Sequence, residues 1–212
     1  MNAPVPPHEA KRLKVLWQYE VLDTVPEEIF DDLTELAARI CEAPIALISL
    51  VDEKRQWFKS KVGISLQETS RDVSFCAHAI THTDLFIVPD ATQDERFAKS
   101  PVVTGEPSIR FYAGAPLITP DGYALGTLCV IDRAPRQLRP DQLQALRILA
   151  RHVVSQLELR RRSRELSHVR EEREQLKSDL DKVRLELRRV RNSFSKTKTK
   201  PSRARRPKGK RR

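Results

Sequence analysis

The chain has 212 residues, with 39 Lys and Arg against 29 Asp and Glu, and a formal net charge of +10. This length allows one domain with extensions or two small domains. No apolar stretch approaches the roughly 18 residues of a membrane-spanning helix, and residues 1–7 lack the features of a signal peptide. Three widely spaced cysteines argue against a disulfide framework or a metal site. We therefore expect a cytoplasmic protein that is not an integral membrane protein.

The charge is unevenly distributed along the chain. Residues 1–155 hold 17 Lys and Arg and 21 Asp and Glu, whereas residues 156–212 hold 22 and 8. The first part is therefore mildly acidic, and the whole basic excess lies in the C-terminal part. Residues 195–212 contain ten basic residues, no acidic ones and no core-forming residue. This composition predicts a disordered basic tail that binds polyanions such as nucleic acid without sequence preference, or that only solubilises the chain.

The N-terminal third predicts a short disordered segment and two helices. Residues 1–7 are rich in proline, and a helix is expected over residues 8–18 with Leu13, Leu16 and Trp17 on one face. Thr24 and Glu27 match a capping box for the second helix. The apolar stripe of this helix consists of Ile29, Phe30, Leu33, Leu36, Ala37 and Ile40.

Short strands and loops are expected in the middle of the chain. Residues 45–51 form a continuous apolar run, and residues 56–62 predict a second strand after a turn at 52–55. A short helix over 74–81, a strand over 85–88 and a helical turn over 95–100 follow. A loop with two prolines leads to residue 109.

Residues 109–132 predict a β-hairpin. Apolar residues occupy nearly every position of both strands, which indicates a sheet that is covered on both faces. The turn Thr119-Pro120-Asp121-Gly122 suits a chain reversal, because Pro presets φ and Gly accepts a positive φ. Gly114 and Gly126 indicate close approach of a packed helix or a ligand to the backbone. Five strands are counted in total, and a sixth is allowed in an unassigned loop.

A long helix begins at Pro140 and continues into a heptad repeat. Its spacing of three and four residues predicts a left-handed coiled coil over residues 159–194. Leu lies at a and Val often at d, the reverse of the usual parallel-dimer preference, so the number of strands is left open. The apolar seam residues are Leu159, Leu166, Val169, Leu176, Leu180, Val183, Leu187 and Val190.

The run FYAGAPL, followed by a turn and LGTLCVID, resembles the second half of a GAF domain. Further similarity extends from about residue 13 to 159 and includes ALISLVD, RQWFKS and SFCAHAI. The resemblance implies an α/β (α+β) fold, in which helices cover both faces of an antiparallel sheet of five to six strands. It also implies a sensory domain of the type found in bacterial histidine kinases and diguanylate cyclases. The expected organisation is 1–7, a domain over 8–158, a coiled coil over 159–194 and a tail over 195–212.

The resemblance implies a small-molecule pocket between the sheet and the elements that cross it. Its candidate lining residues are Trp57, Phe75, Cys76, His78, Asp90, Arg96, Phe97, Arg110 and Tyr112. Arg110 and Tyr112 could bind an anion or a ring, or Arg110 could pair with a nearby Asp while Tyr112 fills the core. Cys76 and His78 lack a third metal ligand, and a buried Cys with a capping or core His is the favoured interpretation.

The cofactor is unknown, although several kinds are not expected. Residues 91–110 contain no Cys for a covalent bilin, and no Gly-rich loop indicates a nucleotide. Some relatives reduce methionine sulfoxide with several cysteines, but no pair here has the spacing of a nucleophile and its resolving thiol. We therefore expect a non-enzymatic homodimer that senses a ligand or redox state and signals to an unidentified partner. The alternative is a ligand-silent adaptor that binds polyanions through its tail.

Overall fold

The computed structural model describes residues 3–197, without the side chains of residue 190 and residues 193–197. Residues 1–2 and 198–212 lie outside the described part, so most of the expected basic tail is not covered. The elements are α1 (Glu9–Gln18), α2 (Glu28–Cys41), β1 (Ile45–Val51), β2 (Arg55–Val62), β3 (Glu68–Ser70), the 3₁₀ turn η1 (Arg71–Val73), α3 (Phe75–Ala79), β4 (Phe86–Val88), α4 (Pro101–Thr104), β5 (Phe111–Ile118), β6 (Ala124–Asp132) and α5 (Pro140–Thr197).

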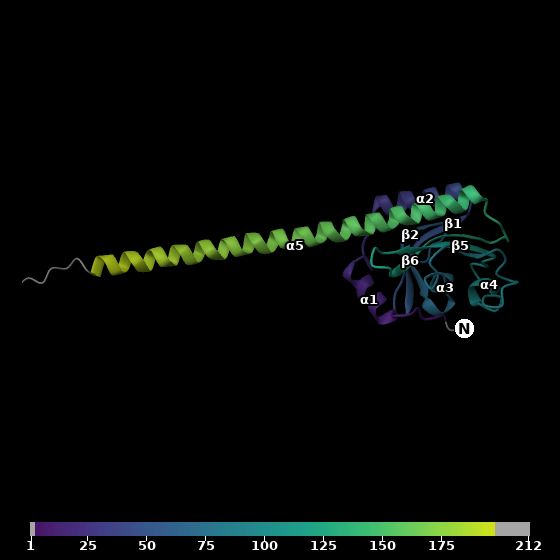
Figure 1. The fold of residues 1–212 in the computed structure, drawn as a ribbon, viewed down its shortest axis with the longest axis horizontal. Helices are drawn as coiled ribbons and strands as arrows, with labels where there is room; N and C mark the ends of the chain where they lie inside the picture. Colours follow the sequence, from purple (N-terminus) through teal and green to yellow (C-terminus); the bar gives the residue numbers. More distant parts are fainter. Residues whose placement is uncertain (1–2, 198–212) are drawn as a thin grey trace, which may run out of the picture. The chain divides into compact units, whose positions relative to one another are not determined.

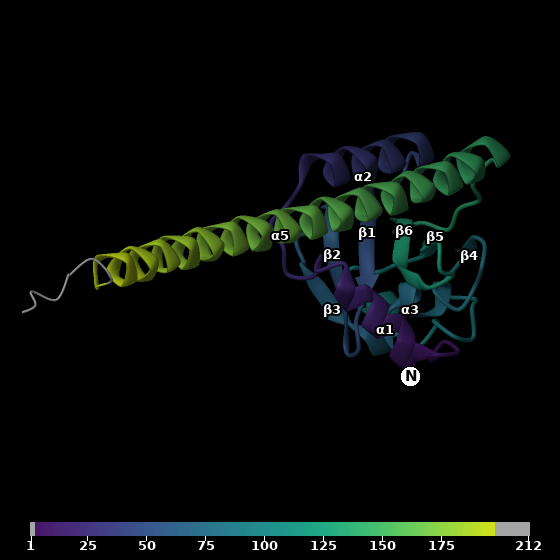
Figure 2. The ribbon, with the colours of Figure 1, turned by 60° about the vertical axis from the view of Figure 1, so that its left-hand side comes forward.

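One antiparallel sheet of six strands organises the domain, in the order β3-β2-β1-β6-β5-β4. Helix α2 and the first part of α5 cover one face, and α3 lies against the other (Figures 1 and 2). The expected α/β fold with helices on both faces is confirmed. The central strand β1 is buried at every position, because both of its faces are covered.

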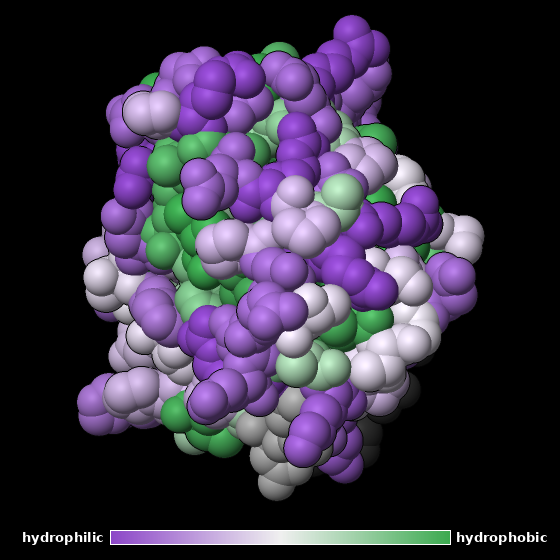
Figure 3. Space-filling view, turned by 90° about the vertical axis from the view of Figure 1, so that its right-hand side faces the viewer, coloured by the Kyte–Doolittle hydropathy of each residue, from purple (hydrophilic) through white to green (hydrophobic). Residues whose placement is uncertain are grey.

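The two faces of the sheet build two separate cores. Alternate residues of β5 illustrate the division: Phe111 and Ala113 pack under α2 and α5, whereas Tyr112 packs under α3. On the face shown in Figure 3 the surface is mostly hydrophilic, with one hydrophobic strip along a side and several smaller hydrophobic areas. Most large apolar side chains of the domain are therefore withdrawn from this face into the cores.

Several local predictions require correction. The sixth strand is β3, which pairs with the start of β2 in a segment that carries little apolar signal. A helix also forms over Pro101–Thr104, where a loop was expected. The capping box is wrong: α2 begins with Glu27 as its N-cap and no side-chain cap bond. Thr24 Oγ1 instead donates to the carbonyl of Val21 at 2.7 Å.

The hairpin prediction is confirmed, and its two key glycines have different roles. Gly122 in the turn has a φ of +83°, a conformation that other residues rarely adopt. At Gly126 on β6, a Cβ would lie 1.8 Å from the carbonyl oxygen of Ser49 on β1. The close neighbour at Gly126 is therefore the adjacent strand β1, and not the helix or ligand that was predicted.

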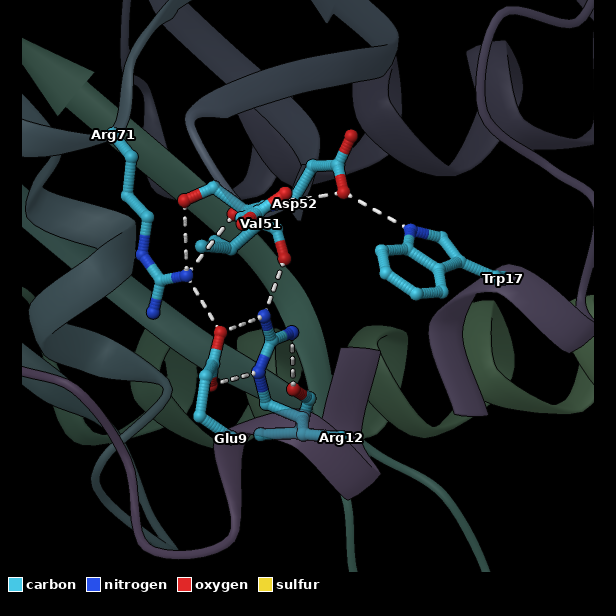
Figure 4. Close-up of polar contacts among 8 residues, drawn as sticks. Glu9, Arg12, Trp17, Val51, Asp52 and Arg71 are labelled. Carbon is cyan, nitrogen blue, oxygen red and sulfur yellow. Dashed lines mark hydrogen bonds and ion pairs between the residues drawn. The ribbon is translucent and has the colours of Figure 1, made fainter. Parts of the chain in front are cut away.

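A buried arginine ties α1 to the ends of the central strands (Figure 4). Arg12 is 2% exposed, and its guanidinium donates to the carbonyl oxygen of Val51 at 2.7 Å and to both carboxylate oxygens of Glu9. Arg71 approaches the same Glu9 carboxylate at 2.6 Å. Trp17 was expected to share the buried face of α1, but it is 51% exposed and donates to Asp52.

The chain divides into two compact units, residues 1–162 and residues 163–212. In the described part of the second unit, α5 presents apolar side chains that are 50% to 70% exposed. Six of these exposed side chains lie at a and d positions of the heptad: Leu166, Val169, Leu176, Leu180, Val183 and Leu187. A row of exposed apolar residues at heptad spacing fits the predicted coiled coil, and dimerisation stays a prediction.

We expect the double variant Leu180→Asp/Leu187→Asp to weaken dimerisation at least about 100-fold, because charges would enter the apolar seam. Analytical ultracentrifugation of the full chain over a concentration series measures this change. Leu185→Asp is the matched control, because Leu185 is 50% exposed but lies at an f position outside the seam. Equal self-association of all three proteins would contradict the prediction.

Candidate functional site

A small cavity lies between α3 and the sheet. Its volume is about 90 Å³, and its wall is mostly apolar. The lining residues are Leu47, Gln56, Phe58, Ile64, Leu66, Thr69, Val73, Ser74, Phe75, Cys76, Val102, Glu106, Pro107, Ile109, Tyr112 and Ile131. This volume is smaller than the ~150 Å³ cavity that admits benzene in an engineered protein. The cavity therefore suits a small, mostly uncharged molecule, with a few polar groups to orient it.

Ser74 fixes both α3 and one wall of the cavity. Its hydroxyl oxygen accepts a hydrogen bond from the backbone N–H of Ala77 at 3.0 Å, which caps the helix. The same hydroxyl contacts the side-chain oxygen of Gln56 on β2. Because Gln56 and Ser74 satisfy each other, these buried polar groups are tolerated inside an apolar wall.

Three of the nine predicted pocket residues, Phe75, Cys76 and Tyr112, line this cavity. The ring of Phe75 stacks on that of Phe97 at 4.0 Å and on that of Tyr112 at 5.2 Å. His78 packs edge-on against Phe97, and burial lowers the pKa of His78. These aromatic rings form a stack that holds α3 against the sheet.

The other predicted pocket residues lie elsewhere. Trp57 faces the opposite core under α2, because it alternates with Phe58 along β2. Arg96 pairs with Asp94 at 2.6 Å. Asp90 caps its own loop through the N–H and hydroxyl of Thr92.

Arg110 was considered either as an anion-binding residue or as a partner of Asp90 or Asp94. Its guanidinium instead donates to the carbonyl oxygen of Val103 at 2.8 Å and to that of Ile109 at 3.1 Å. Arg110 therefore holds the α4 loop beside β5 through backbone contacts.

Two cysteines, one of which lines the cavity, lie next to each other between α3 and the sheet. The sulfur atoms of Cys76 on α3 and Cys129 on β6 are 3.8 Å apart, and both residues are buried. The Tyr112 hydroxyl donates to the Cys76 sulfur at 3.3 Å and lies 3.4 Å from Thr127 Oγ1. The interpretation that these cysteines are isolated is wrong, because residues 53 positions apart in sequence become neighbours across the helix and the sheet.

The two thiols of this pair differ in acidity. Burial raises the pKa of Cys76, but hydrogen bonds from Cys129, Thr127 and Tyr112 outweigh burial and lower the pKa to about 7. Burial and the neighbouring Cys76 sulfur raise the pKa of Cys129 well above its usual value. The pair therefore gives up its first proton far more readily than its second.

A second polar cluster lies on the opposite face, where α5 leaves the domain. Lys59 on β2 has a fully buried side chain, and its ammonium donates to Glu27 Oε1 at 2.6 Å, Thr24 Oγ1 at 2.9 Å and the Val25 carbonyl at 2.8 Å. Arg160 on α5 donates to the same Glu27 oxygen at 2.9 Å. We call Lys59, Glu27 and Arg160 the exit cluster.

A β-bulge on β2 places Lys59 and the next residue on the same side of the sheet. The pairing of β1 with β2 shifts between Ile48 and Ser49, which leaves Lys59 as an extra residue on β2. Lys59 and its neighbour Ser60 consequently both contact the segment around α2, where Ser60 donates to Asp31 at 2.6 Å. The exit cluster depends on the packing of α2 and α5 over this side of β2, which no pattern in the sequence indicates.

Among residues 3–197, no group of three or more His, Cys, Asp or Glu side chains is placed to hold a metal ion. No helix in the described part of the chain is both long and apolar enough to cross a membrane.

The described domain is a mixed α/β fold, with helices on both faces of a six-stranded antiparallel sheet and a small cavity under a short helix. The family model for the GAF domain matches residues 25–157. The chain belongs to the GAF domain family.

Known proteins show the same family and fold. Residues of this chain are 47% identical over 133 positions to the cyclic di-GMP phosphodiesterase PA2567 of Pseudomonas aeruginosa, covering 63% of this chain but 23% of that protein. The chain thus matches about a quarter of the length of this curated relative.

Two solved structures share the fold at low sequence identity. The GAF domain of an Acinetobacter phosphoenolpyruvate-protein phosphotransferase aligns with a TM-score of 0.53 and 17% identity, covering 71% of this chain and 92% of that one. The free methionine-R-sulfoxide reductase of Neisseria meningitidis aligns with a TM-score of 0.53 and 14% identity, covering 77% and 98%. These likenesses concern the fold alone.

Proposed function

We propose that this chain is a sensory module that binds a small, mostly uncharged molecule in the cavity under α3 and passes the change to α5. One observation carries the proposal: strand β2 contributes both to the cavity and to the exit cluster. Gln56 and Phe58 line the cavity, while the adjacent Lys59 holds Glu27, which in turn holds Arg160 on α5.

A ligand can shift β2 only if it binds one conformation of the domain, with β2 displaced, more tightly than the other. A ligand that pushes Phe58 outward would displace Lys59, because the two residues are consecutive. Since Lys59 is buried and hydrogen-bonded on three sides, it cannot absorb the shift by reorienting in solvent. The shift therefore reaches Glu27 and Arg160.

The output we propose is a dimeric coiled coil of α5 that signals to a protein partner. The phosphodiesterase name of the relative applies to a protein most of which has no counterpart here, so we propose no catalytic activity for this chain. Most of the predicted tail, residues 198–212, lies outside the described residues, and its contact with polyanions stays a prediction.

Val73→Phe tests the coupling by filling the cavity with a larger side chain. We expect it to change hydrogen exchange of the backbone amides at residues 156–162 by at least about threefold, and we expect Lys59→Met to abolish that response. Val5→Phe is the matched control, because Val5 is 70% exposed and lies outside the cavity. An unchanged exchange rate in Val73→Phe, or a response that persists without Lys59, would sink the proposed route.

A further inference from the structure

We propose that Cys76 and Cys129 form a peroxide-reactive dithiol site, in which a small peroxide enters the cavity under α3 and converts the two thiols to an intramolecular disulfide. The proposed reaction does not require the small-molecule ligand proposed above, because the groups that react with the peroxide are two thiols of the protein.

Geometry brings the two sulfurs within reach of one another. They are 3.8 Å apart, whereas a disulfide bond is ~2.0 Å long, so closure requires a relative movement of a little under ~2 Å. Cys129 lies in the middle of a central strand, buried at every neighbouring position. Cys76 lies on the five-residue helix α3, which is attached through Ser74 and the ring stack. We therefore expect α3, and not β6, to move when the two sulfurs approach each other.

Access favours Cys76 as the residue that reacts first. Cys76 lines the cavity, whereas Cys129 is not among its lining residues. A volume of about 90 Å³ holds a molecule the size of hydrogen peroxide, since one water needs only about 10–15 Å³ on the same measure. Larger oxidants such as a glutathione disulfide would not fit without opening the cavity.

The local hydrogen bonds prepare the Cys76 sulfur for reaction. The Tyr112 hydroxyl donates to it at 3.3 Å, and a thiolate is the reactive form of cysteine. These hydrogen bonds lower the pKa of Cys76 below its usual value, which favours its thiolate form. The third cysteine, Cys41 on α2, lies in the opposite core, where burial raises its pKa to about 11.

The reaction balances in two steps. The Cys76 thiolate attacks one peroxide oxygen, the O–O bond breaks, and hydroxide leaves and takes up a proton, which produces a sulfenic acid and one water. The Cys129 sulfur then attacks the Cys76 sulfur, the S–O bond breaks, and a second water leaves with the Cys129 proton. Two thiols are thus oxidised to one disulfide while one peroxide is reduced to two waters. An external dithiol reverses the process.

Closure of the disulfide changes the cavity itself. Phe75 and Cys76 are consecutive on α3 and both line the cavity, so drawing Cys76 toward β6 moves one wall. It also displaces the Tyr112 hydroxyl, which contacts the Cys76 sulfur. Oxidation therefore produces a different internal surface from the reduced state.

The test uses the full-length reduced protein, treated with about one equivalent of hydrogen peroxide and then alkylated under denaturing conditions. Intact mass spectrometry should show that two of the three thiols are lost, and peptide mapping should show a Cys76–Cys129 link. Dithiothreitol should restore all three thiols. The loss of these two thiols should be at least about tenfold faster than the loss of the Cys41 thiol, because the Cys41 thiol is much less ionised.

Single variants assign the order of the steps. In Cys129→Ser, peroxide should leave a sulfenic acid at Cys76 that is captured by dimedone. In Cys76→Ser, both remaining thiols should survive the same dose. Cys41→Ser is the control and should still form the disulfide.

Two outcomes would overturn the site. One is the survival of all three thiols in the folded wild-type protein. The other is oxidation of Cys41 as fast as Cys76, which would show general oxidation without a selective site. Wild-type protein unfolded in urea serves as the reference for such unselective oxidation, so the conclusion does not depend on the folding of any variant.

Discussion

Gly126→Ala should lower the free energy of unfolding of the domain by about 3 kcal/mol or more, which is a large part of the ~5–15 kcal/mol that holds a typical domain together. The added Cβ would lie 1.8 Å from the carbonyl oxygen of Ser49 and 2.8 Å from the Cα of Leu50. Both are backbone atoms of β1, the central strand, and they cannot rotate away as a side chain would. Either β1 and β6 separate locally or their hydrogen bonds distort.

Urea unfolding followed by circular dichroism measures this loss, with Gly122→Ala as the matched control. Gly122 has a φ of +83° but nothing within 4 Å of its added Cβ, so its substitution should cost only about 1 kcal/mol through backbone strain. The comparison separates a steric clash inside the sheet from a conformational cost in a turn. If Gly126→Ala unfolded within about 1 kcal/mol of Gly122→Ala, the close strand contact would not be a constraint on the fold.

The behaviour of these glycines shows how far the hairpin could be predicted from sequence. The alternating apolar pattern and the turn residues predict two buried strands and the reversal between them, and the structure confirms both. A glycine in a strand indicates a close neighbour, but the sequence does not say which one. At Gly126 the neighbour is a strand formed some 75 residues earlier, which only the sheet order defines.

The candidate site could also be predicted only in part, because its neighbours depend on tertiary packing. Phe75, Cys76 and Tyr112 were predicted through the family resemblance, and they line the cavity. Trp57 was assigned to the same pocket, although alternation along β2 turns it to the other core. The contact between Cys76 and Cys129 depends on the packing of α3 over β6. Neither composition nor spacing carries that information, because it arises from tertiary packing.

Lys59 is the clearest case of a residue whose importance sequence could not reveal. A lysine in a strand normally indicates a solvent-facing position. Here it lies on the same side of β2 as Trp57, which α2 covers, so its side chain is fully buried and lies 5.3 Å from the ring centre of Phe30. The packing of α2 thus places an expected surface charge at the centre of the exit cluster.

Lys59→Met should lower the free energy of unfolding by about 3 kcal/mol, because it removes one partner of a buried ion pair and leaves three acceptors with fewer donors. Glu27→Gln should cost less, about 2 kcal/mol, because the Glu27 side chain keeps a third of its surface in solvent. The control Arg39→Met breaks an ion pair with Glu35 whose partners are 75% and 53% exposed, and it should cost less than about 0.5 kcal/mol.

The pH dependence of these costs distinguishes the ion pair from simple packing. Burial raises the pKa of Glu27, but hydrogen bonds from Lys59 and Arg160 outweigh burial and hold it below its usual 4.5. A carboxyl whose pKa is depressed by folding stabilises the protein above its unfolded pKa, and this stabilisation is lost as pH falls through the folded value. The gap in unfolding free energy between wild type and Glu27→Gln should therefore narrow from about pH 5 to about pH 3. Urea titrations measure this difference in unfolding free energy between wild type and Glu27→Gln. A difference that stayed constant over this pH range would show that packing, and not the charge of Glu27, holds α5 at this point. The proposed route from β2 to α5 would then lose its physical basis.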